Sequence, residues 1–245
     1  MRADRFLYLP MVKQQLPLDL YLRDSASFLN YVVGDNSEAC FALESLPDPG
    51  NRHRMIWLSG SPGTGKSHLL EALCHRALEM GLSVMYLSLD SEEMRATDSA
   101  TNVLDGLEQL DVICIDDIEA VAGVPHWEQA LFVLCELARN SGCALAMAAD
   151  KPANELSIDL PDLKTRLAGW FLGYHLKPLA DAGKREALQR RAENRGLHLD
   201  EDVVQYVLNR YPRDMHALFE LVERIDIASM THRRRVTIPF LRTLE

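Results

Sequence analysis

Long apolar runs are missing from this 245-residue chain, and no stretch approaches the about 18 apolar residues of a membrane-spanning helix. The first residues, MRADRFLYLPMV, lack the longer apolar run and the small-residue cleavage site of a secretory signal. The five cysteines include no CxxC pair and mostly lie within apolar segments, which favours buried, reduced thiols. We therefore expect a cytoplasmic protein that does not associate with a membrane.

An excess of positive charge is also missing. The formal net charge is −10 and the pI is near 5.3, whereas non-specific affinity for duplex DNA comes chiefly from Lys and Arg that neutralise phosphates. The basic run of residues 232–235 is most simply a solvated turn, with weak DNA contact as the minority interpretation. The eight histidines show no HxxxH spacing, so no metal chemistry other than that of Mg²⁺ is indicated.

The order of apolar runs predicts an α/β fold with three parts. Residues 1–24 form an arm that contains Pro10 and Pro17 and has no sustained helical period. From residue 25, short β-rich runs alternate with longer helical ones, which is typical of a parallel sheet flanked by helices on both faces. After Gly196 only helical patterns follow. The predicted domains are residues 1–24, 25–178 and 179–245, the last being a small α-helical domain.

One short motif carries the strongest functional signal. The segment GSPGTGKS at 60–67 fits the P-loop pattern, with its residues being Gly60, Gly63, Thr64, Gly65, Lys66 and Ser67. Glycines let backbone N–H groups turn toward phosphates, Lys66 reaches the β and γ phosphates, and the Ser67 hydroxyl can ligate Mg²⁺. The alternative is a chance glycine-rich turn, but an apolar strand precedes the motif and a long helix follows it. We predict that ATP or ADP binds here with Mg²⁺.

A second strand, DVICIDDIE at 111–119, ends in two carboxylates. In open α/β sheets, ligands bind at the carboxyl ends of the strands, where Asp116 and Asp117 would lie. Asp116 would hold Mg²⁺, directly or through water, and Asp117 could polarise an attacking water. The alternative is an ordinary strand that runs into an acidic turn.

With these two motifs in place, further segments carry a family resemblance. SFLNYVVGDNSEA at 27–39, CIDDIEAVAG at 114–123, LPDLKTRL at 160–167 and RRRVTIPFLRTLE at 233–245 resemble the AAA+ class, and within it the bacterial initiator DnaA and the Hda family of DnaA-homologous regulators. The resemblance covers nearly the full length. It implies an AAA+ P-loop domain followed by a helical lid domain, preceded by an extended arm.

The resemblance also implies roles for three single residues. Asp150 is similar to the sensor of the γ-phosphate, although a turn or cap aspartate is the simpler alternative. Arg166 matches an arginine finger that reaches ATP on a neighbouring molecule, with an exposed helical arginine as the alternative. Arg213 corresponds to the lid arginine that contacts bound nucleotide, unless it only solvates the start of its helix.

The arm contains QLPLDL at 15–20, which is similar to the element that docks such regulators on the replicative sliding clamp. An extended segment of this kind inserts leucines into an apolar groove while a glutamine amide satisfies polar groups at the rim. The residues concerned are Gln15, Leu16, Leu18 and Leu20. The alternative is that the leucines pack on the chain's own domain.

Together the resemblance implies a negative regulator of chromosome replication initiation. Its partners would be the DNA-loaded sliding clamp and the initiator DnaA, with DNA contacted mainly through the clamp and with self-association possible. Arg166 would stimulate hydrolysis of the ATP held by DnaA, while hydrolysis by the chain itself stays open. An autonomous AAA+ ATPase or helicase-loading factor is the alternative, and it predicts that Asp117 is essential and the arm dispensable.

Overall fold

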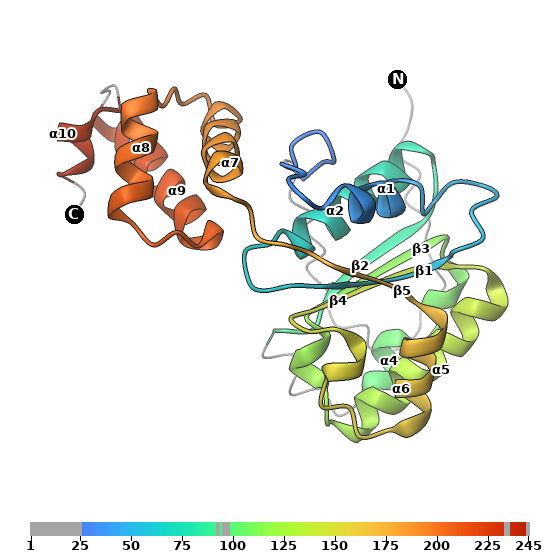
Figure 1. Cartoon of the computed structure of the whole chain (residues 1–245). Helices are drawn as coiled ribbons and strands as arrows, with labels where there is room; N and C mark the ends of the chain where they lie inside the picture. The colour runs from blue at the N-terminus through green and yellow to red at the C-terminus, as the bar shows by residue number, and fades with distance from the viewer. Residues whose placement is uncertain (1–25, 92–93, 95–98, 233–235, 244–245) are drawn as a thin grey trace.

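The computed structural model describes residues 26–91, 94, 99–232 and 236–243. The arm of residues 1–24, including Gln15, Leu16, Leu18 and Leu20, therefore lies outside the described residues, as do Arg233, Arg234 and Arg235. Figure 1 shows two domains joined by a single connecting segment: an α/β domain built on a sheet, and a group of helices at the C-terminal end.

The α/β domain is built on a parallel sheet with the strand order β2-β3-β4-β1-β5. Every pairing in the sheet is parallel, and Ile56 of β1 stands opposite both Ala146 of β4 and Leu172 of β5. All residues of β1, β3 and β4 are buried, as their continuous apolar sequences predict. The strands are β1 Met55–Ser59, β2 Val84–Ser88, β3 Val112–Asp116, β4 Ala144–Ala149 and β5 Leu172–His175.

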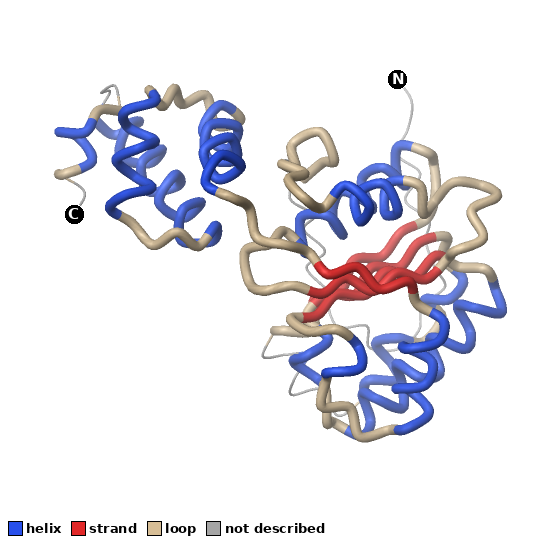
Figure 2. Tube along the Cα trace, in the orientation of Figure 1, coloured by secondary structure: helices blue, strands red, loops and turns tan. Residues whose placement is uncertain are grey.

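Helices cover both faces of the sheet (Figure 2). On one face lie α1 Ser37–Glu44 and α2 Lys66–Glu79; on the other lie α4 Ala100–Leu104, α5 Pro125–Ser141 and α6 Pro161–Trp170. Short 3-10 turns occupy Leu107–Gln109, Ile118–Val121 and Ala153–Glu155.

Each face of the sheet has its own core because successive strand residues point to opposite sides. Met55 and Trp57 belong to the core under α5, while Ile56 and Leu58 belong to the core under α2. The five cysteines are free and buried, as the sequence predicts.

The C-terminal domain consists of α7 Asp181–Glu193, α8 Glu201–Arg210, α9 Met215–His232 and α10 Ile238–Leu241. Its core is built from Leu188, Val204, Leu218 and Phe240, and Val32 from the N-terminal segment packs against the same cluster. The predicted fold class is therefore confirmed: a parallel sheet flanked by helices, followed by a small helical domain. Among the described helices none has the length and apolar character needed to span a membrane.

Candidate nucleotide-binding site

The loop between β1 and α2 has the backbone geometry that its glycines predict. Gly60, Gly63 and Gly65 adopt φ of 156°, 79° and 93°. A Cβ on Gly60 would come 2.9 Å from the carbonyl oxygen of Leu176, so a side chain is excluded there. Helix α2 begins at Lys66, directly after the loop, so its unpaired N–H groups and positive end face the loop. The Lys66 Nζ donates to the Gly60 carbonyl at 2.8 Å.

Tyr31 covers this loop, and sequence reasoning did not identify it. The Tyr31 hydroxyl donates to the Thr64 carbonyl at 3.0 Å and accepts from Asn36 Nδ2 at 3.3 Å. Asn36 Nδ2 also donates to the Lys177 carbonyl at 3.0 Å, which ties the segment before α1 to the chain after β5. Burial raises the pKa of Tyr31 to about 12. In the sequence, Tyr31 stands out only as an aromatic residue within segment 27–39, which resembles DnaA.

Asp116 is the last residue of β3, the position that the sequence predicts, and it lies beside the start of α2. It is fully buried, accepts a hydrogen bond from the Tyr86 hydroxyl at 3.0 Å, and is hydrogen-bonded to Ser67. Burial, with a smaller contribution from Asp117, raises the pKa of the Asp116 carboxyl. The two groups predicted to hold Mg²⁺, Ser67 and Asp116, are therefore neighbours.

Asp117 follows in a left-handed conformation with φ of 58°, which is uncommon for a residue other than glycine. The Ser88 hydroxyl donates to Asp117 Oδ2 at 2.7 Å, and the Asp117 N–H donates to Asp116 Oδ1 at 3.0 Å. The two carboxylates therefore have different partners: Asp116 contacts Ser67 of α2 and Tyr86 of β2, while Asp117 contacts Ser88 at the end of β2.

Two further carboxylates lie close to this edge of the sheet. Burial raises the pKa of Glu119, with Asp150 and Asp117 adding to the effect and Lys66 opposing it. Within the described part of the chain, Glu119 Oε2 and Asp150 Oδ1 are buried without a hydrogen-bond partner. Such atoms ordinarily meet a water or a bound group. Glu119 was not identified from the sequence, because one acidic residue after a strand carries no distinctive signal.

The donor set fits a nucleotide with Mg²⁺. No three His, Cys, Asp or Glu side chains come together as a metal site among the described residues. Mg²⁺ in phosphate sites is held by one or two protein ligands, with water and phosphate oxygens filling the remaining positions. Ser67 and Asp116 can supply those ligands, and Glu119, which interacts electrostatically with both Lys66 and Asp150, lies close to the same loop.

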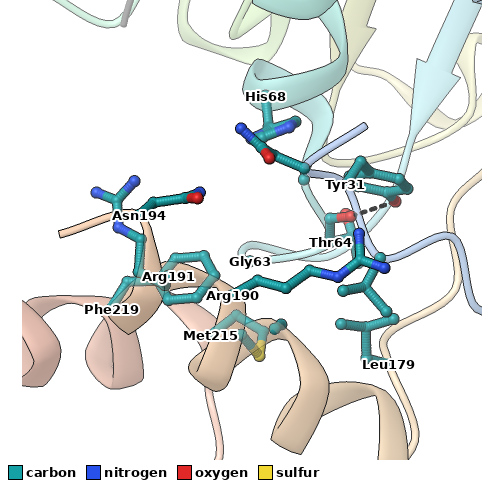
Figure 3. Close-up of a pocket in the computed structure, with 14 residues that line it drawn as sticks. Tyr31, Gly63, Thr64, His68, Leu179, Arg190, Arg191, Asn194, Met215 and Phe219 are labelled. Atoms are coloured by element: carbon teal, nitrogen blue, oxygen red, sulfur yellow. Dashed lines mark hydrogen bonds between the residues drawn. The ribbon is translucent and has the colours of Figure 1, made fainter. Parts of the chain in front are cut away.

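A pocket lies between the phosphate loop and the helical domain (Figure 3). Its walls come from the segment before α1, from the loop and α2, and from α7 and α9. The residues that line it include Asn30, Tyr31, Gly63, Thr64, Gly65, His68, Leu179, Arg190, Arg191, Asn194, Met215 and Phe219. A pocket that is largely apolar and adjoins a phosphate loop is suited to a nucleotide base and sugar.

Arg213 is not among these lining residues. Its Nη1 donates to Asp181 Oδ2 at 2.9 Å and its Nε donates to the Leu208 carbonyl at 3.1 Å. The next residue, Asp214, does approach the loop, since a Cβ on Gly63 would come 2.8 Å from Asp214 Oδ1. The structure thus brings the start of α9 to the phosphate loop while the Arg213 guanidinium contacts its own domain.

Arg166 also lies apart from the pocket, on α6. Its Nε donates to Glu136 Oε1 at 2.7 Å, and its guanidinium faces the rings of Trp170 and Phe132. A finger that acts on another molecule need not lie near the chain's own phosphate loop.

Models of known protein families match both domains of the chain. The family model described as the bacterial DnaA ATPase domain matches residues 22–172, more than half of the chain. The chain belongs to the bacterial DnaA ATPase family. A second family model, the lid domain of Hda, matches residues 181–244. The protein is thus a DnaA-homologous AAA+ protein of the Hda type, as the sequence motifs predict.

Solved structures of DnaA share this fold. Domain III of the Thermotoga maritima replication initiation protein DnaA is 22% identical, with a TM-score of 0.78 over 91% of this chain and 97% of that chain. AMPPCP-bound DnaA from Aquifex aeolicus is 20% identical, with a TM-score of 0.68 over 86% of this chain and 68% of that one. The Thermotoga maritima Holliday junction branch migration motor RuvB also matches, at 17% identity and a TM-score of 0.61 over 84% and 66%. Because this fold serves different functions, function has to be argued from the site.

Proposed function

We propose that this protein is a negative regulator of chromosome replication initiation in the cytoplasm. In this proposal it docks on the DNA-loaded sliding clamp and stimulates hydrolysis of the ATP bound to DnaA. The observation that carries the proposal is the combination of a DnaA-type ATPase domain with an Hda-type lid over nearly the whole chain. A domain homologous to DnaA is suited to associate with DnaA as AAA+ domains associate with one another.

Arg166 supplies the chemistry in this proposal. An arginine contributed in trans stabilises charge that develops on the transferred phosphate, and such residues are worth about 10³ to 10⁵ in rate. The Arg166 side chain is 31% exposed, so it can be reached by a second molecule. The nucleotide that reacts is the one held by DnaA, and Arg166 enters that site from outside.

Tethering explains why the arm and Arg166 belong to one mechanism. Gln15, Leu16, Leu18 and Leu20 hold the protein on the clamp, which raises its effective concentration near DnaA on the same DNA. A weak contact between the two AAA+ domains is then sufficient. Loss of the clamp from DNA ends the stimulation, which couples DnaA inactivation to replication.

The chain's own nucleotide has a structural role in this proposal. ADP or ATP binds at Gly60, Gly63, Thr64, Gly65, Lys66 and Ser67, with Mg²⁺ held by Ser67 and Asp116, and with Asp150 and Arg213 toward the phosphates. Because the pocket is lined from both domains, bound nucleotide stabilises the lid against the α/β domain. That contact fixes the shape of the surface presented to DnaA.

The deciding experiment follows labelled ATP prebound to DnaA, with this protein added alone or with clamp loaded on DNA. The wild type is compared with Arg166→Ala and with the double variant Leu18→Ala/Leu20→Ala. We expect clamp-dependent hydrolysis that both variants lose. Equal stimulation by the wild type and Arg166→Ala would contradict the proposal.

The complete phosphate loop and the Asp116–Asp117 pair support a second candidate function, an autonomous ATPase or helicase-loading factor. The orphaned oxygens of Glu119 and Asp150 favour it as well, since they could orient a water near Lys66. This candidate predicts turnover by the protein alone that Asp117→Ala abolishes and that Leu18→Ala/Leu20→Ala leaves unchanged. Measuring phosphate release without DnaA separates the two functions.

A further inference from the structure

Arg166 contacts three residues of its own domain. Nε donates to Glu136 Oε1 at 2.7 Å. The guanidinium carbon lies 4.7 Å from the ring centroid of Trp170 and 5.7 Å from that of Phe132. Phe132 and Glu136 are one turn apart on α5, and Trp170 is one turn after Arg166 on α6, so the cluster follows directly from helix spacing.

Of the three guanidinium nitrogens of Arg166, only Nε takes part in a hydrogen bond with a described residue. Within the part of the chain that the structure describes, Nη1 and Nη2 of Arg166 have no hydrogen-bond partner. The contacts with the two rings and the bond from Nε together restrict the orientation of the group. The Nη donors form the planar fork that recognises phosphate oxygens in pairs.

An ordinary surface ion pair is the simpler interpretation, and such pairs contribute little. Two observations distinguish this one. Both side chains are about two-thirds covered, with 31% of Arg166 and 33% of Glu136 exposed. Trp170 also contacts a second arginine, since the guanidinium carbon of Arg139 lies 4.1 Å from its centroid. The guanidinium is therefore anchored by its neighbours, while its Nη1 and Nη2 donors stay available for another group.

Anchoring matters because an unrestrained arginine has many rotamers. Fixing one of them costs an entropy worth on the order of 30-fold in a rate or equilibrium constant. A side chain already held in one orientation avoids part of that cost when it meets a phosphate. Glu136 makes the one directional contact in the cluster, because the aromatic faces tolerate rotation of the guanidinium.

We propose that Glu136 is a positioning residue for Arg166: it holds Nε so that Nη1 and Nη2 are presented to the phosphates of the partner's nucleotide. This inference rests on the proposed function of Arg166. It predicts a defect in the maximal rate, because Glu136 sets the geometry of the finger and does not hold the two proteins together.

The first test measures hydrolysis of DnaA-bound ATP as a function of the concentration of this protein, with clamp loaded on DNA. We expect Glu136→Ala to lower the maximal stimulated rate about 3- to 10-fold, with the half-saturating concentration unchanged. Glu136→Gln keeps an Oε1 acceptor for Nε and retains most of the rate. The exposed Glu155 provides the matched control: it lies in the 3-10 turn that contacts α6, and Glu155→Gln removes the same charge and leaves the rate unchanged.

A second test needs no partner. NMR of the Arg166 Nε–H in the isolated protein, assigned through its loss in Arg166→Ala, is expected to show a signal protected from exchange. That protection disappears in Glu136→Ala and persists in Glu136→Gln and Glu155→Gln. An unprotected signal in the wild type would overturn the anchoring itself, whatever the protein does to DnaA.

The two tests separate the possible failures. If Arg166→Ala loses stimulation but Glu136→Ala keeps the wild-type rate or exceeds it, the positioning role of Glu136 is wrong while the proposed function stands. If Arg166→Ala stimulates fully, the proposed function fails, and the positioning role fails with it even where the NMR signal is protected.

Discussion

The ring of Tyr31 lies directly over Gly65, the last residue of the phosphate loop before α2. A Cβ on Gly65 would come 2.6 Å from Tyr31 Cε2, which is closer than packed atoms approach. The Tyr31 hydroxyl also donates to the carbonyl of Thr64, the residue before Gly65. The segment before α1 therefore closes one side of the loop and depends on the absence of a side chain at Gly65.

This relationship predicts the effect of Gly65→Ala. The substitution meets both an unfavourable φ of 93° and the Tyr31 ring, so we expect a loss of about 2–4 kcal/mol in the free energy of unfolding. Gly81→Ala is the matched control, because Gly81 has a φ of 78° with nothing near its Cβ position, and should lose only about 1 kcal/mol. Urea unfolding of both variants measures the difference. Equal losses would show that the Tyr31 ring moves away without cost.

Tyr31 also predicts a dependence on alkaline pH. The tyrosine ionises near pH 10.0 when unfolded, but burial raises its pKa to about 12 in the folded protein. Folding therefore favours the neutral hydroxyl, and this contribution is fully present below pH 10 and is lost as the pH rises toward 12.

The variant Tyr31→Phe isolates that contribution. Near neutral pH it should be less stable than the wild type by about 1–2 kcal/mol, because the hydroxyl joins Asn36 to the Thr64 carbonyl. Between pH 10 and 12 the wild type should lose more stability than the variant, so the difference between their free energies of unfolding narrows. Urea unfolding at several pH values measures it, and a gap that stays constant with pH would contradict the predicted role of burial.

The phosphate loop was predictable because its functional residues are close together in the sequence. The glycines, Lys66 and Ser67 lie within one loop, so their spacing identified them, and Asp116 was placed at the same sheet edge because it ends an apolar parallel strand. The strand order, with β1 between β4 and β5, could not be obtained this way, since it depends on how separate β-α units pack. Tyr31 was missed for a related reason: its contact with Gly65 joins residues 34 positions apart.

The surroundings of Arg166 were also beyond sequence reasoning. The segment LPDLKTRL identified the arginine by resemblance, but nothing in it indicates Glu136, which lies 30 residues earlier. The orientation of Arg213 was not predictable either, because exposed arginines choose among acceptors of similar strength. Sequence patterns specify which residue types are needed at a site, while long-range packing decides which way their side chains point.

A buried carboxylate on α5 sets the position of α6. Glu128 is 2% exposed and accepts hydrogen bonds from the backbone N–H groups of Gly123, Asp159 and Leu160. Glu128→Gln replaces one acceptor oxygen with an NH₂ group that faces these donors, so we expect a loss of about 2–4 kcal/mol in the free energy of unfolding.

Two measurements check this role of Glu128. Urea unfolding gives the loss, with Glu79→Gln on exposed α2 surface as a control that should change stability by less than about 0.5 kcal/mol. Hydrogen exchange should show faster exchange of the α6 amides in Glu128→Gln, because the variant releases the backbone that leads into this helix. Uniform acceleration throughout the domain would contradict a local role.

The lid arginine gives the last prediction. The ion pair between Arg213 and Asp181 is exposed, with 51% and 60% of the two side chains accessible, and such pairs are worth about 0–1 kcal/mol. A hydrogen bond from Arg213 to a phosphate is worth about 1.5–3 kcal/mol, so nucleotide can draw the guanidinium away from Asp181.

Arg213→Ala is therefore expected to weaken ADP binding about 10-fold or more, measured by calorimetric titration. Asp181→Asn removes the competing carboxylate and should leave the affinity unchanged or raise it. Arg190→Ala tests one of the two lid arginines, Arg190 and Arg191, that already line the pocket. If Arg213→Ala leaves the ADP affinity unchanged and Arg190→Ala weakens it, the prediction for Arg213 is wrong. The lid residue that contacts the nucleotide would then be Arg190 of α7, which already lines the pocket.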